Sequence, residues 1–395
     1  YLAERAGIAL SPSRTSSAAL VGESAGPVES GTTRADLVRA NAMAAEFFRL
    51  MLRRDDLGAV GRDLIRKRGI SQEMVESFGL GLSPDRWDGL LLTVQNKGMS
   101  PSLFAEAGLL KQRESEGGYY DSFRNRLMFP IHDQIGRVIA FGARKIREED
   151  EPKYLNSPET RLFEKSGTLY GLYQAAKSIQ TERTAIITEG YTDTIACHQA
   201  GVCNVVATLG TALTRKHATV LRRLCDTVVL LFDGDDAGQR AADRAVEVFF
   251  AEEIDVKIAT LSSVTDAKDP DELLKRDDGV EVLRSAIARA VDLLEYRYAR
   301  VRERLSGAGM SALDRAVEDD LKRLVELGFD RVPLRRRMLI VKRISALTGL
   351  NERVIAATIP AGRSQAQFGR VTSELRSRPV LTNQARALGC LLCDA

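Results

Sequence analysis

Between residues 184 and 261 the sequence alternates short aliphatic and β-branched runs with segments of helix length, and this alternation constrains the fold most. The runs predicted as strands are 184–188, 205–207, 228–232 and 256–260. They are apolar at consecutive positions, so both faces of each strand must be covered, as in a parallel sheet between helices. The sequence therefore predicts an α/β domain with a central parallel sheet and helices on both faces.

The composition is typical of a globular protein of two or three domains. The 395 residues carry 57 Lys and Arg against 54 Asp and Glu, a net charge of +3, and 44% of the chain is hydrophobic. No apolar run of about 18 residues and no secretion signal are evident, which favours a cytoplasmic protein. The five cysteines are irregularly spaced and predict neither a disulfide framework nor a metal site.

The positive charge is unevenly distributed along the chain. Residues 124–147 contain six basic side chains and only one acidic one, Asp133. The apolar runs 127–131 and 138–141, with a turn at 133–136 between them, predict a pair of strands. We expect a basic ribbon that could follow the phosphates of a single-stranded nucleic acid. The charge alone is explained equally well by a solvated sheet face.

Three acidic motifs follow strands of the predicted parallel sheet. They are Glu189-Gly-Tyr-Thr-Asp193, Asp233-Gly-Asp235 and Asp269-Pro-Asp271. Each alone has a structural explanation as a turn or helix cap, but parallel strands bring their carboxyl ends to one edge, so we expect the motifs to face one another. Clustered carboxylates repel unless a cation lies among them, and Mg²⁺ prefers such oxygens. Together the motifs predict a metal-dependent phosphotransfer site.

At these residues the sequence resembles the Toprim domain that primases and topoisomerases share, with a Glu-Gly motif on one strand and an Asp-x-Asp motif on a later one. More narrowly, it is similar to the bacterial replicative primases of the DnaG type. The resemblance covers residues 41–355, and its motifs include Arg68-Gly-Ile-Ser71, Phe123–Ile131, Gly136–Arg144, Pro152–Thr160 and Ala207–Thr214.

This resemblance implies a nucleotidyltransferase that makes short RNA primers from ribonucleoside triphosphates on single-stranded DNA during replication. The implied catalytic acids are Glu189, Asp193, Asp233 and Asp235, and the implied metal ligands are Glu189, Asp233, Asp235, Asp269 and Asp271. The implied nucleotide- and template-binding residues are Arg124, Arg126, Arg144, Lys153 and Lys165. The implied cofactor is Mg²⁺, with Mn²⁺ as an alternative, and zinc is expected only in an N-terminal domain outside this chain.

The implied partners are the DNA template, the nucleotides, the RNA–DNA hybrid product and the replicative helicase, with a single-strand-binding protein as a further candidate. We expect a monomeric core without membrane contact.

The chain departs from the family pattern at Thr192, where Met is usual, and at Ala143, where a second Gly is usual. It also departs at 164–167, where Glu-Lys-Ser-Gly replaces a stretch of the His-Lys-Gly-Arg type.

We expect the chain to be a fragment, because its first residues look like the end of a helix. The predicted parts are a linker after a missing zinc-binding domain (1–38), a basic N-terminal subdomain of the core (39–180), a Toprim domain (181–290), a helical subdomain (291–359), a second linker (360–382) and the start of a truncated helicase-binding domain (383–395).

Three other functions use parts of the same pattern. A topoisomerase would need a nucleophilic Tyr in a separate strand-cleavage domain, which the helical tail does not offer. A Toprim nuclease would use water as its nucleophile and would cleave nucleic acid without nucleotides. A binding module associated with a helicase would keep the basic ribbon and lose acids, but all six are present here.

Some conspicuous residues receive a structural interpretation. We interpret the single Trp87 as a packing residue and assign no catalysis to His132, His198 and His217, which share no ligand spacing. A second basic cluster at 331–343 has helical spacing and predicts the solvated face of a packed helix.

Overall fold

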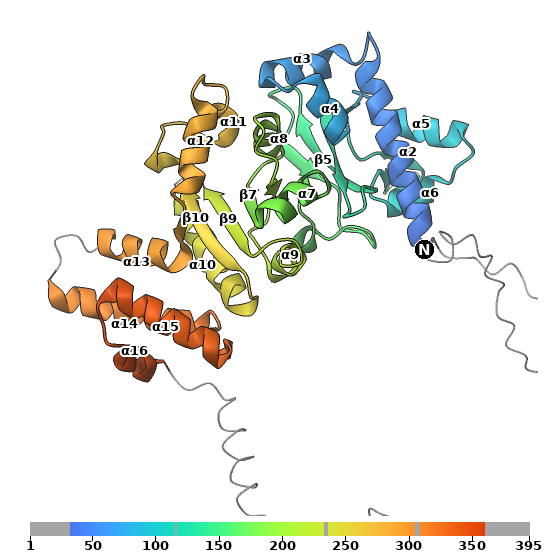
Figure 1. Ribbon diagram of the computed structural model, residues 1–395. Helices are drawn as coiled ribbons and strands as arrows, with labels where there is room; N and C mark the ends of the chain where they lie inside the picture. The colour runs from blue at the N-terminus through green and yellow to red at the C-terminus, as the bar shows by residue number, and fades with distance from the viewer. Residues whose placement is uncertain (1–31, 115–116, 233–235, 305–308, 360–395) are drawn as a thin grey trace, which may run out of the picture. The chain divides into compact units, whose positions relative to one another are not determined.

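The structure is a computed structural model that describes residues 32–114, 117–232, 236–304 and 309–359 (Figure 1). The second acidic motif, with Asp233 and Asp235, lies outside the described residues, as do the segments 360–382 and 383–395. Among the residues that the structure describes, no helix is both long and apolar enough to cross a membrane.

An antiparallel sheet forms the centre of the N-terminal part. Its order is β1-β4-β5-β6. These strands span Gly81–Ser83, Arg126–His132, Val138–Lys145 and Tyr154–Asn156. The predicted strand pair is thereby confirmed, because β4 and β5 pair in antiparallel register with Leu127 opposite Arg144. A separate two-stranded sheet joins β2 (Leu110–Gln112) and β3 (Tyr119–Asp121).

Helices cover the antiparallel sheet. They are α2 (Arg34–Arg53), α3 (Ala59–Arg68), α4 (Gln72–Phe78), α5 (Gly89–Asn96) and α6 (Pro101–Glu106). Helix α2 approaches β1 closely, because a Cβ added at Gly81 would lie 2.6 Å from the Cβ of Phe48. Phe48 also meets Phe141 of β5 edge to face, with ring centroids 5.3 Å apart. The sheet face that carries Phe141 is therefore buried against α2.

Helix α2 begins inside the stretch that the sequence predicts as a linker (1–38). It starts at Arg34, and Leu37 is already 1% exposed. Leu37, Ala40, Asn41 and Ala44 are buried at helical spacing and form one face of α2. The linker composition therefore does not extend as far as residue 38, because the apolar face of α2 recruits residues 34–38 into the helix.

The predicted α/β region forms a five-stranded sheet of order β11-β10-β9-β7-β8. The strands are β7 (Thr184–Thr188), β8 (Val205–Ala207), β9 (Thr227–Phe232), β10 (Asp255–Thr260) and β11 (Val291–Asp292). The first four are parallel, as predicted, whereas β11 runs antiparallel to β10. The sequence does not reveal β11, because it has two residues and precedes a helix directly.

Alternate side chains of the parallel strands enter two different cores. Ile187, Val228 and Leu230 join a large core that continues into the C-terminal helices. Their neighbours Ile186 and Val229 join a smaller core on the opposite face. The covering helices are α7 (Leu172–Glu182), α8 (Tyr191–Gln199), α9 (Arg215–Leu221), α10 (Asp236–Ala251), α11 (Pro270–Leu273) and α12 (Gly279–Ala288). The predicted fold class, an α/β sheet with helices on both faces, is confirmed.

The C-terminal part is helical, as predicted. It consists of α13 (Leu293–Arg304), α14 (Met310–Glu326), α15 (Leu334–Thr348) and α16 (Glu352–Thr358). In the second basic cluster, Arg336 donates to the main-chain oxygens of Phe249 and Ile254, and Arg343 pairs with Asp292. The prediction of a solvated basic face fits the exposed Arg335 and Lys342, but Arg336 is partly buried and points inward, whereas the apolar Leu334, Met338 and Leu339 are exposed.

Candidate active site

The first acidic motif joins β7 to α8. Glu189 is exposed at the end of β7, and Asp193 lies in the first turn of α8 with 9% of its surface accessible. Between them, a Cβ at Gly190 would lie 2.5 Å from Oδ2 of Asp193. A larger residue at position 190 would therefore push the Asp193 carboxylate out of its present position.

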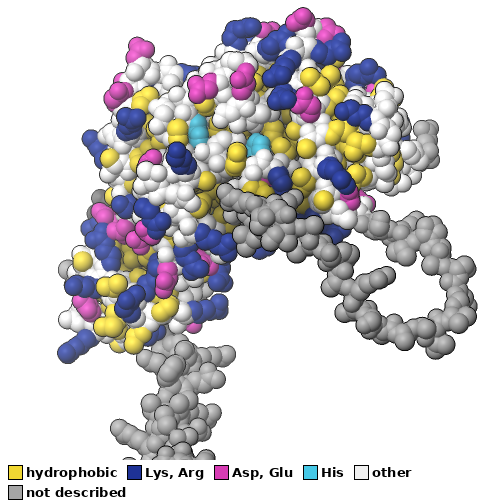
Figure 2. Space-filling view, turned by 45° about the vertical axis from the view of Figure 1, so that its right-hand side comes forward, with side chains coloured by type: hydrophobic (Ala, Val, Ile, Leu, Met, Phe, Trp, Pro, Cys, Tyr) yellow, Lys and Arg dark blue, Asp and Glu magenta, His cyan; other side chains and the backbone are white. Residues whose placement is uncertain are grey.

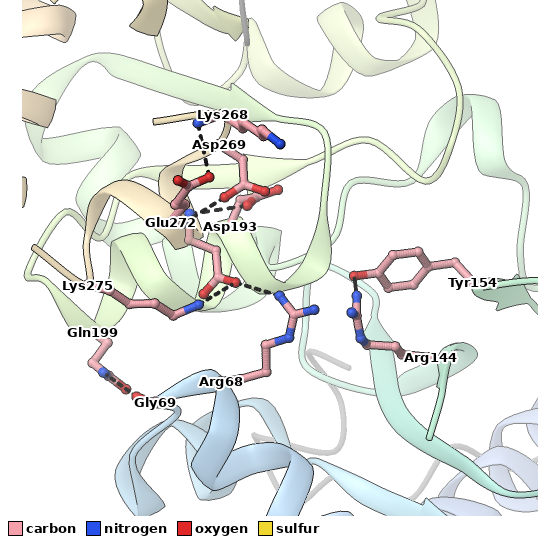
Figure 3. A network of polar contacts seen from close by, with 11 residues as sticks. Arg68, Gly69, Arg144, Tyr154, Asp193, Gln199, Lys268, Asp269, Glu272 and Lys275 are labelled. Atoms are coloured by element: carbon pink, nitrogen blue, oxygen red, sulfur yellow. Dashed lines mark hydrogen bonds and ion pairs between the residues drawn. The ribbon is translucent and has the colours of Figure 1, made fainter. Parts of the chain in front are cut away.

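The third acidic motif caps and begins α11, and it contacts the first motif. Oδ1 of Asp269 accepts the main-chain N–H of Glu272 at 2.7 Å, which is the helix-cap interaction that the sequence also allowed. The main-chain N–H of Asp271 donates to Oδ1 of Asp193 at 3.4 Å. The structure therefore brings two of the three predicted motifs together at the carboxyl edge of the sheet (Figure 3).

Asp271 is buried and already has cationic partners. Its Oδ2 lies 2.8 Å from Nη1 of Arg68 and 3.0 Å from Nζ of Lys275 (Figure 3). Sequence reasoning missed Arg68 as a site residue, although its segment Arg68-Gly-Ile-Ser71 was among the motifs of the resemblance. Within that segment, the side chain of Gln199 on α8 bonds the oxygen of Gly69 and the N–H of Ser71, both at 2.8 Å. The corner between α3 and α4 is thus fastened to both acidic helices.

The side chains at this edge fit Mg²⁺ by their chemistry. Glu189, Asp193 and Asp269 offer carboxylate oxygens, the donors that Mg²⁺ prefers. Within the described ranges, no three Asp, Glu, His or Cys side chains are close enough to hold a metal ion by themselves. Strand β9, which Asp233 and Asp235 follow in the sequence, lies between β7 and β10. The ligand set predicted from the sequence therefore depends on those two acids for completion.

The predicted basic ribbon is divided by the pleat of the antiparallel sheet. Arg126 is opposite Lys145 in the β4–β5 register, whereas Arg144 is opposite Leu127 on the other face. Two further members of the ribbon are paired with acids at the surface, Arg137 with Asp133 and Arg147 with Asp85. On the face shown in Figure 2, Lys and Arg side chains are likewise interspersed with Asp and Glu. The expectation of one continuous ribbon is wrong, because a count of charges along a strand ignores that successive side chains point to opposite faces of the sheet.

Arg144 lies on the sheet face that packs against the Toprim region. Its Nη1 donates to Oη of Tyr154, and its guanidinium carbon lies 5.0 Å from the centre of that ring. The same face receives Tyr191 of α8, since a Cβ at Gly142 would lie 2.3 Å from the Tyr191 ring. Figure 3 shows the Arg144–Tyr154 pair beside the acidic network. Lys153 is exposed next to it, with Nζ 5.9 Å from the Tyr154 ring.

Arg126 is held differently. It is 6% exposed and donates to the main-chain oxygens of Pro152 and Glu151 at 2.7 and 3.1 Å. Burial lowers the pKa of the Arg126 guanidinium from its usual value, but an arginine remains charged at neutral pH. Its contacts stabilise the loop that carries Lys153, so the part of Arg126 in the site is to support that loop.

Trp87 is a surface residue, which corrects its interpretation as a simple packing residue. Its side chain is 58% exposed, and the guanidinium carbon of Arg124 lies 3.6 Å above its ring. Tyr120 stands beside it at 5.6 Å between centroids. The main-chain oxygen of Trp87 accepts the N–H of Asp121 at 2.8 Å, which fixes the main chain that carries this exposed ring. An accessible aromatic ring under an arginine is a surface on which a nucleobase can stack.

Lys165 lies in a short 3-10 turn, η1 (Lys165–Gly167), between the two sheets in the sequence. The acid that precedes it, Glu164, forms an ion pair with Lys216 of α9 and accepts a hydrogen bond from Ser166 at 2.7 Å. The hydrogen bond from Lys216 is the main reason that the pKa of Glu164 is lowered. Glu164 therefore has a cationic partner of its own, and the departure from the family pattern at 164–167 does not cancel the charge of Lys165.

Comparison with known proteins agrees with this architecture. Residues 47–176 match the model of the DNA primase catalytic core, N-terminal domain, and residues 186–274 match the Toprim-like model. The DNA primase of Halalkalibacterium halodurans is 37% identical over 293 residues, which are 74% of this chain and 48% of that protein. The chain thus spans about half the length of the curated relatives it matches.

Solved structures give the same result for the fold. A DNA primase domain from Pseudomonas aeruginosa is 34% identical, with a TM-score of 0.71 over 82% of this chain and 99% of that one. A DnaG primase catalytic domain bound to single-stranded DNA is 30% identical, with a TM-score of 0.69 over 81% of this chain and 98% of that one.

A domain of the primase catalytic-core type followed by a Toprim-like domain defines the class to which this architecture belongs, that of primase catalytic cores. The chain belongs to the bacterial DnaG-type DNA primase family. Members of this Toprim family use divalent metal ions.

Proposed function

We propose that this chain is the RNA polymerase core of a bacterial primase, which condenses ribonucleoside triphosphates into short primers on single-stranded DNA at the replication fork, in the cytoplasm. The observation that carries the proposal is the hydrogen bond from the main chain of Asp271 to Asp193. It joins two acidic motifs, and Figure 3 shows Arg144 of β5 beside this network. The single-stranded DNA held by one structural relative supports the choice of template.

In this proposal the acids hold the metal and the arginines hold the phosphates. Glu189, Asp193 and Asp269 would bind Mg²⁺ together with Asp233 and Asp235, and the metal would supply electrostatic stabilisation of the triphosphate oxygens. Asp271 would act mainly through its main-chain N–H, since its carboxylate already contacts Arg68 and Lys275. Mg²⁺ is the ion we propose, with Mn²⁺ as a substitute.

The bond-forming step then needs only positioning and one proton acceptor. The 3′-oxygen of the growing primer bonds to the α-phosphorus, the bond to the β-phosphate oxygen breaks, and pyrophosphate leaves. Arg144 and Lys153 would orient the phosphates. Glu189 is exposed at the end of β7 and would either take the hydroxyl proton or hold metal.

The template would meet Trp87 and Arg124 on the basic subdomain. Base stacking on Trp87 and a phosphate contact by Arg124 would bind single-stranded DNA weakly and with a strong dependence on salt. The RNA–DNA hybrid would leave along the same subdomain. We propose the replicative helicase and a single-strand-binding protein as partners of the whole protein.

A primer-synthesis assay tests this function. The protein is incubated with a single-stranded template, the four ribonucleoside triphosphates and Mg²⁺, and RNA products are separated by length. We expect short products with the wild type and none with the variant that combines Asp233→Ala with Asp235→Ala. If the double variant makes primers at the normal rate, the assignment of these acids is wrong.

Parallel incubations separate the other functions of the Toprim class. A nuclease would shorten the template in the presence of metal alone. A topoisomerase would relax supercoiled DNA without nucleotides. We expect neither reaction, and either one at a rate above primer synthesis would contradict the proposal.

A further inference from the structure

His217 is a fully buried histidine that the proposed mechanism does not use. It lies in the first turn of α9 with 0% of its surface exposed. Its main-chain N–H donates to Oγ1 of Thr214 at 3.2 Å, and its Nδ1 accepts the main-chain N–H of Thr214 at 3.3 Å. The opposite ring nitrogen, Nε2, lies 2.9 Å from the main-chain oxygen of Lys165. One imidazole therefore connects the start of α9 to the η1 turn.

The two bonds determine the protonation state of the ring. Nδ1 must be unprotonated because it accepts from Thr214, and Nε2 must carry hydrogen because its partner is a carbonyl oxygen. Only the neutral imidazole with its hydrogen on Nε2 satisfies both bonds, since an imidazolium has no acceptor. Burial lowers the pKa of His217, which agrees with the neutral form.

The start of α9 supplies two side-chain hydrogen bonds to the main chain of the η1 turn. Oγ1 of Thr214 donates to the oxygen of Ser166, so α9 holds two consecutive carbonyl groups of the turn, those of Lys165 and Ser166. Outside the turn, Lys216 pairs with Glu164. The main-chain N–H of Lys165 adds one bond to Oε1 of Glu159 at 3.2 Å.

We propose that His217 is a positioning residue, which fixes the main chain of Lys165 so that the lysine ammonium group points at the nucleotide phosphates. The inference rests on the proposed function and on the nucleotide-binding role that the resemblance to the primases implies for Lys165. It adds His217 to the proposed site, although this residue belongs neither to the acidic motifs nor to the arginines discussed above. A long lysine side chain binds a phosphate in one place only if its own main chain is fixed, and the imidazole supplies one of the bonds that fix it, beside the bond from the Lys165 N–H to Glu159.

Two amide variants separate the two bonds of the ring. In His217→Asn the amide oxygen takes the place of Nδ1 and preserves the cap of α9, but the shorter side chain cannot reach Lys165. In His217→Gln the amide nitrogen takes the place of Nε2 and preserves the bond to Lys165, while the cap is weakened. Arg223→Gln is the matched control, because Arg223 is an exposed side chain just beyond the same helix.

The first readout is hydrogen exchange of the main chain at 164–168, which reports the turn whether or not the protein makes primers. We expect faster exchange in His217→Asn than in the wild type, and an intermediate rate in His217→Gln. The second readout is equilibrium binding of a fluorescent ATP analogue with Mg²⁺. We expect about fivefold weaker binding in His217→Asn, the effect of one lost hydrogen bond, and little further loss when Lys165→Ala is added.

The outcomes distinguish the inference from the function on which it rests. If His217→Asn leaves both exchange at 164–168 and nucleotide affinity unchanged, the inference is wrong. If Lys165→Ala binds the analogue as well as the wild type does, the nucleotide-binding assignment of Lys165 is wrong. The proposal for His217 then fails too, even if hydrogen exchange at 164–168 is faster in His217→Asn. If affinity falls in His217→Gln but not in His217→Asn, the cap of α9 matters and the bond to Lys165 does not, which also overturns the proposal.

Discussion

The two charged regions of this chain, the acidic edge of the parallel sheet and the arginine-bearing antiparallel sheet, hold their charges in different ways. At the acidic edge, the carboxylate of Asp271 is paired with Arg68 and Lys275. On the antiparallel sheet, Arg144 and Arg126 are held by a tyrosine hydroxyl and by main-chain oxygens, which carry no net charge.

This difference determines where net charge remains available to a ligand. A neutral partner orients a cation and leaves its charge uncompensated, so Arg144 keeps its attraction for phosphates. A cationic partner offsets a carboxylate, so Asp271 contributes less negative charge to a metal site than its position in the motif suggests. We therefore expect Glu189, Asp193 and Asp269, and not the carboxylate of Asp271, to act on the metal at one region, and Arg144 to act on the phosphates at the other.

The largest effect should come from removing one charge at the acidic edge. Asp193→Asn keeps an oxygen that accepts the N–H of Asp271, so the local structure should survive while the negative charge is lost. We expect primer synthesis to fall at least about 100-fold, as when one electrostatic contact to a transition state is removed. Asp63→Asn, an exposed acid on α3, is the matched control and should retain full activity. Normal synthesis by Asp193→Asn would show that the first motif is structural.

A second experiment tests whether Arg68 supports the acidic edge. In Arg68→Gln the buried carboxylate of Asp271 loses one of its two cations, and we expect the free energy of unfolding to fall by about 2 kcal/mol. Arg66→Gln removes an exposed pair with Asp63 on the same helix and should cost less than about 1 kcal/mol. Urea unfolding measures both. Equal losses in the two variants would mean that the buried pair adds nothing beyond a surface pair.

In a double-mutant cycle with Asp271→Asn, the effect of Arg68→Gln should become much smaller. An unchanged effect would show that Arg68 stabilises the corner between α3 and α4 by packing and not by its charge.

At the antiparallel region we expect smaller effects on the binding of single-stranded DNA. They divide into base stacking by Trp87 and charge neutralisation by Arg124. Trp87→Ala should weaken binding of single-stranded DNA about tenfold and leave its salt dependence unchanged, since stacking does not neutralise phosphate. Arg124→Gln should lower the salt slope by about one. Arg147→Gln is the control, because Arg147 is already paired with Asp85 at the surface. Titrations by fluorescence anisotropy at several salt concentrations measure these changes, and equal slopes in Trp87→Ala and Arg124→Gln would contradict the division.

The smallest effect is a pH dependence that both regions share. His132 on β4 and His198 on α8 both have a pKa lowered by burial from the ordinary 6.5. The unfolded chain therefore binds protons that the folded chain does not, and stability falls as the pH drops below about 6.5. Each histidine contributes at most about 1.4 kcal/mol per pH unit.

The His198→Gln variant tests the contribution from the acidic side. Its amide can still donate to the oxygen of Val205, the partner of Nε2 at 2.8 Å. We expect a flatter stability profile between pH 6.5 and 5.5 than in the wild type. A profile as steep as that of the wild type would show that His198 titrates with the same pKa in the folded and unfolded chain.

Much of the fold and part of the site were predictable from the sequence. The strands of the parallel sheet and the β4–β5 pair follow from short-range patterns of apolar residues, and those patterns act over a few neighbours. Strand β11 was missed because two residues are too few to show the alternation of apolar and polar side chains that predicts a strand. The basic ribbon was misjudged because a count along the chain does not separate the two faces of a strand.

The sequence by itself determined which residue types end each strand, and so where the acids Glu189, Asp193, Asp269 and Asp271 lie along the chain. The tertiary structure alone decided their partners. Arg68 and Asp271 are separated by 203 positions, and no local pattern links them. Likewise, the exposure of Trp87 beneath Arg124, and the bond from His217 to Lys165, depend on how distant segments pack. The physical reason is range: secondary structure responds to neighbours in sequence, whereas burial, ion pairing and stacking respond to neighbours in space.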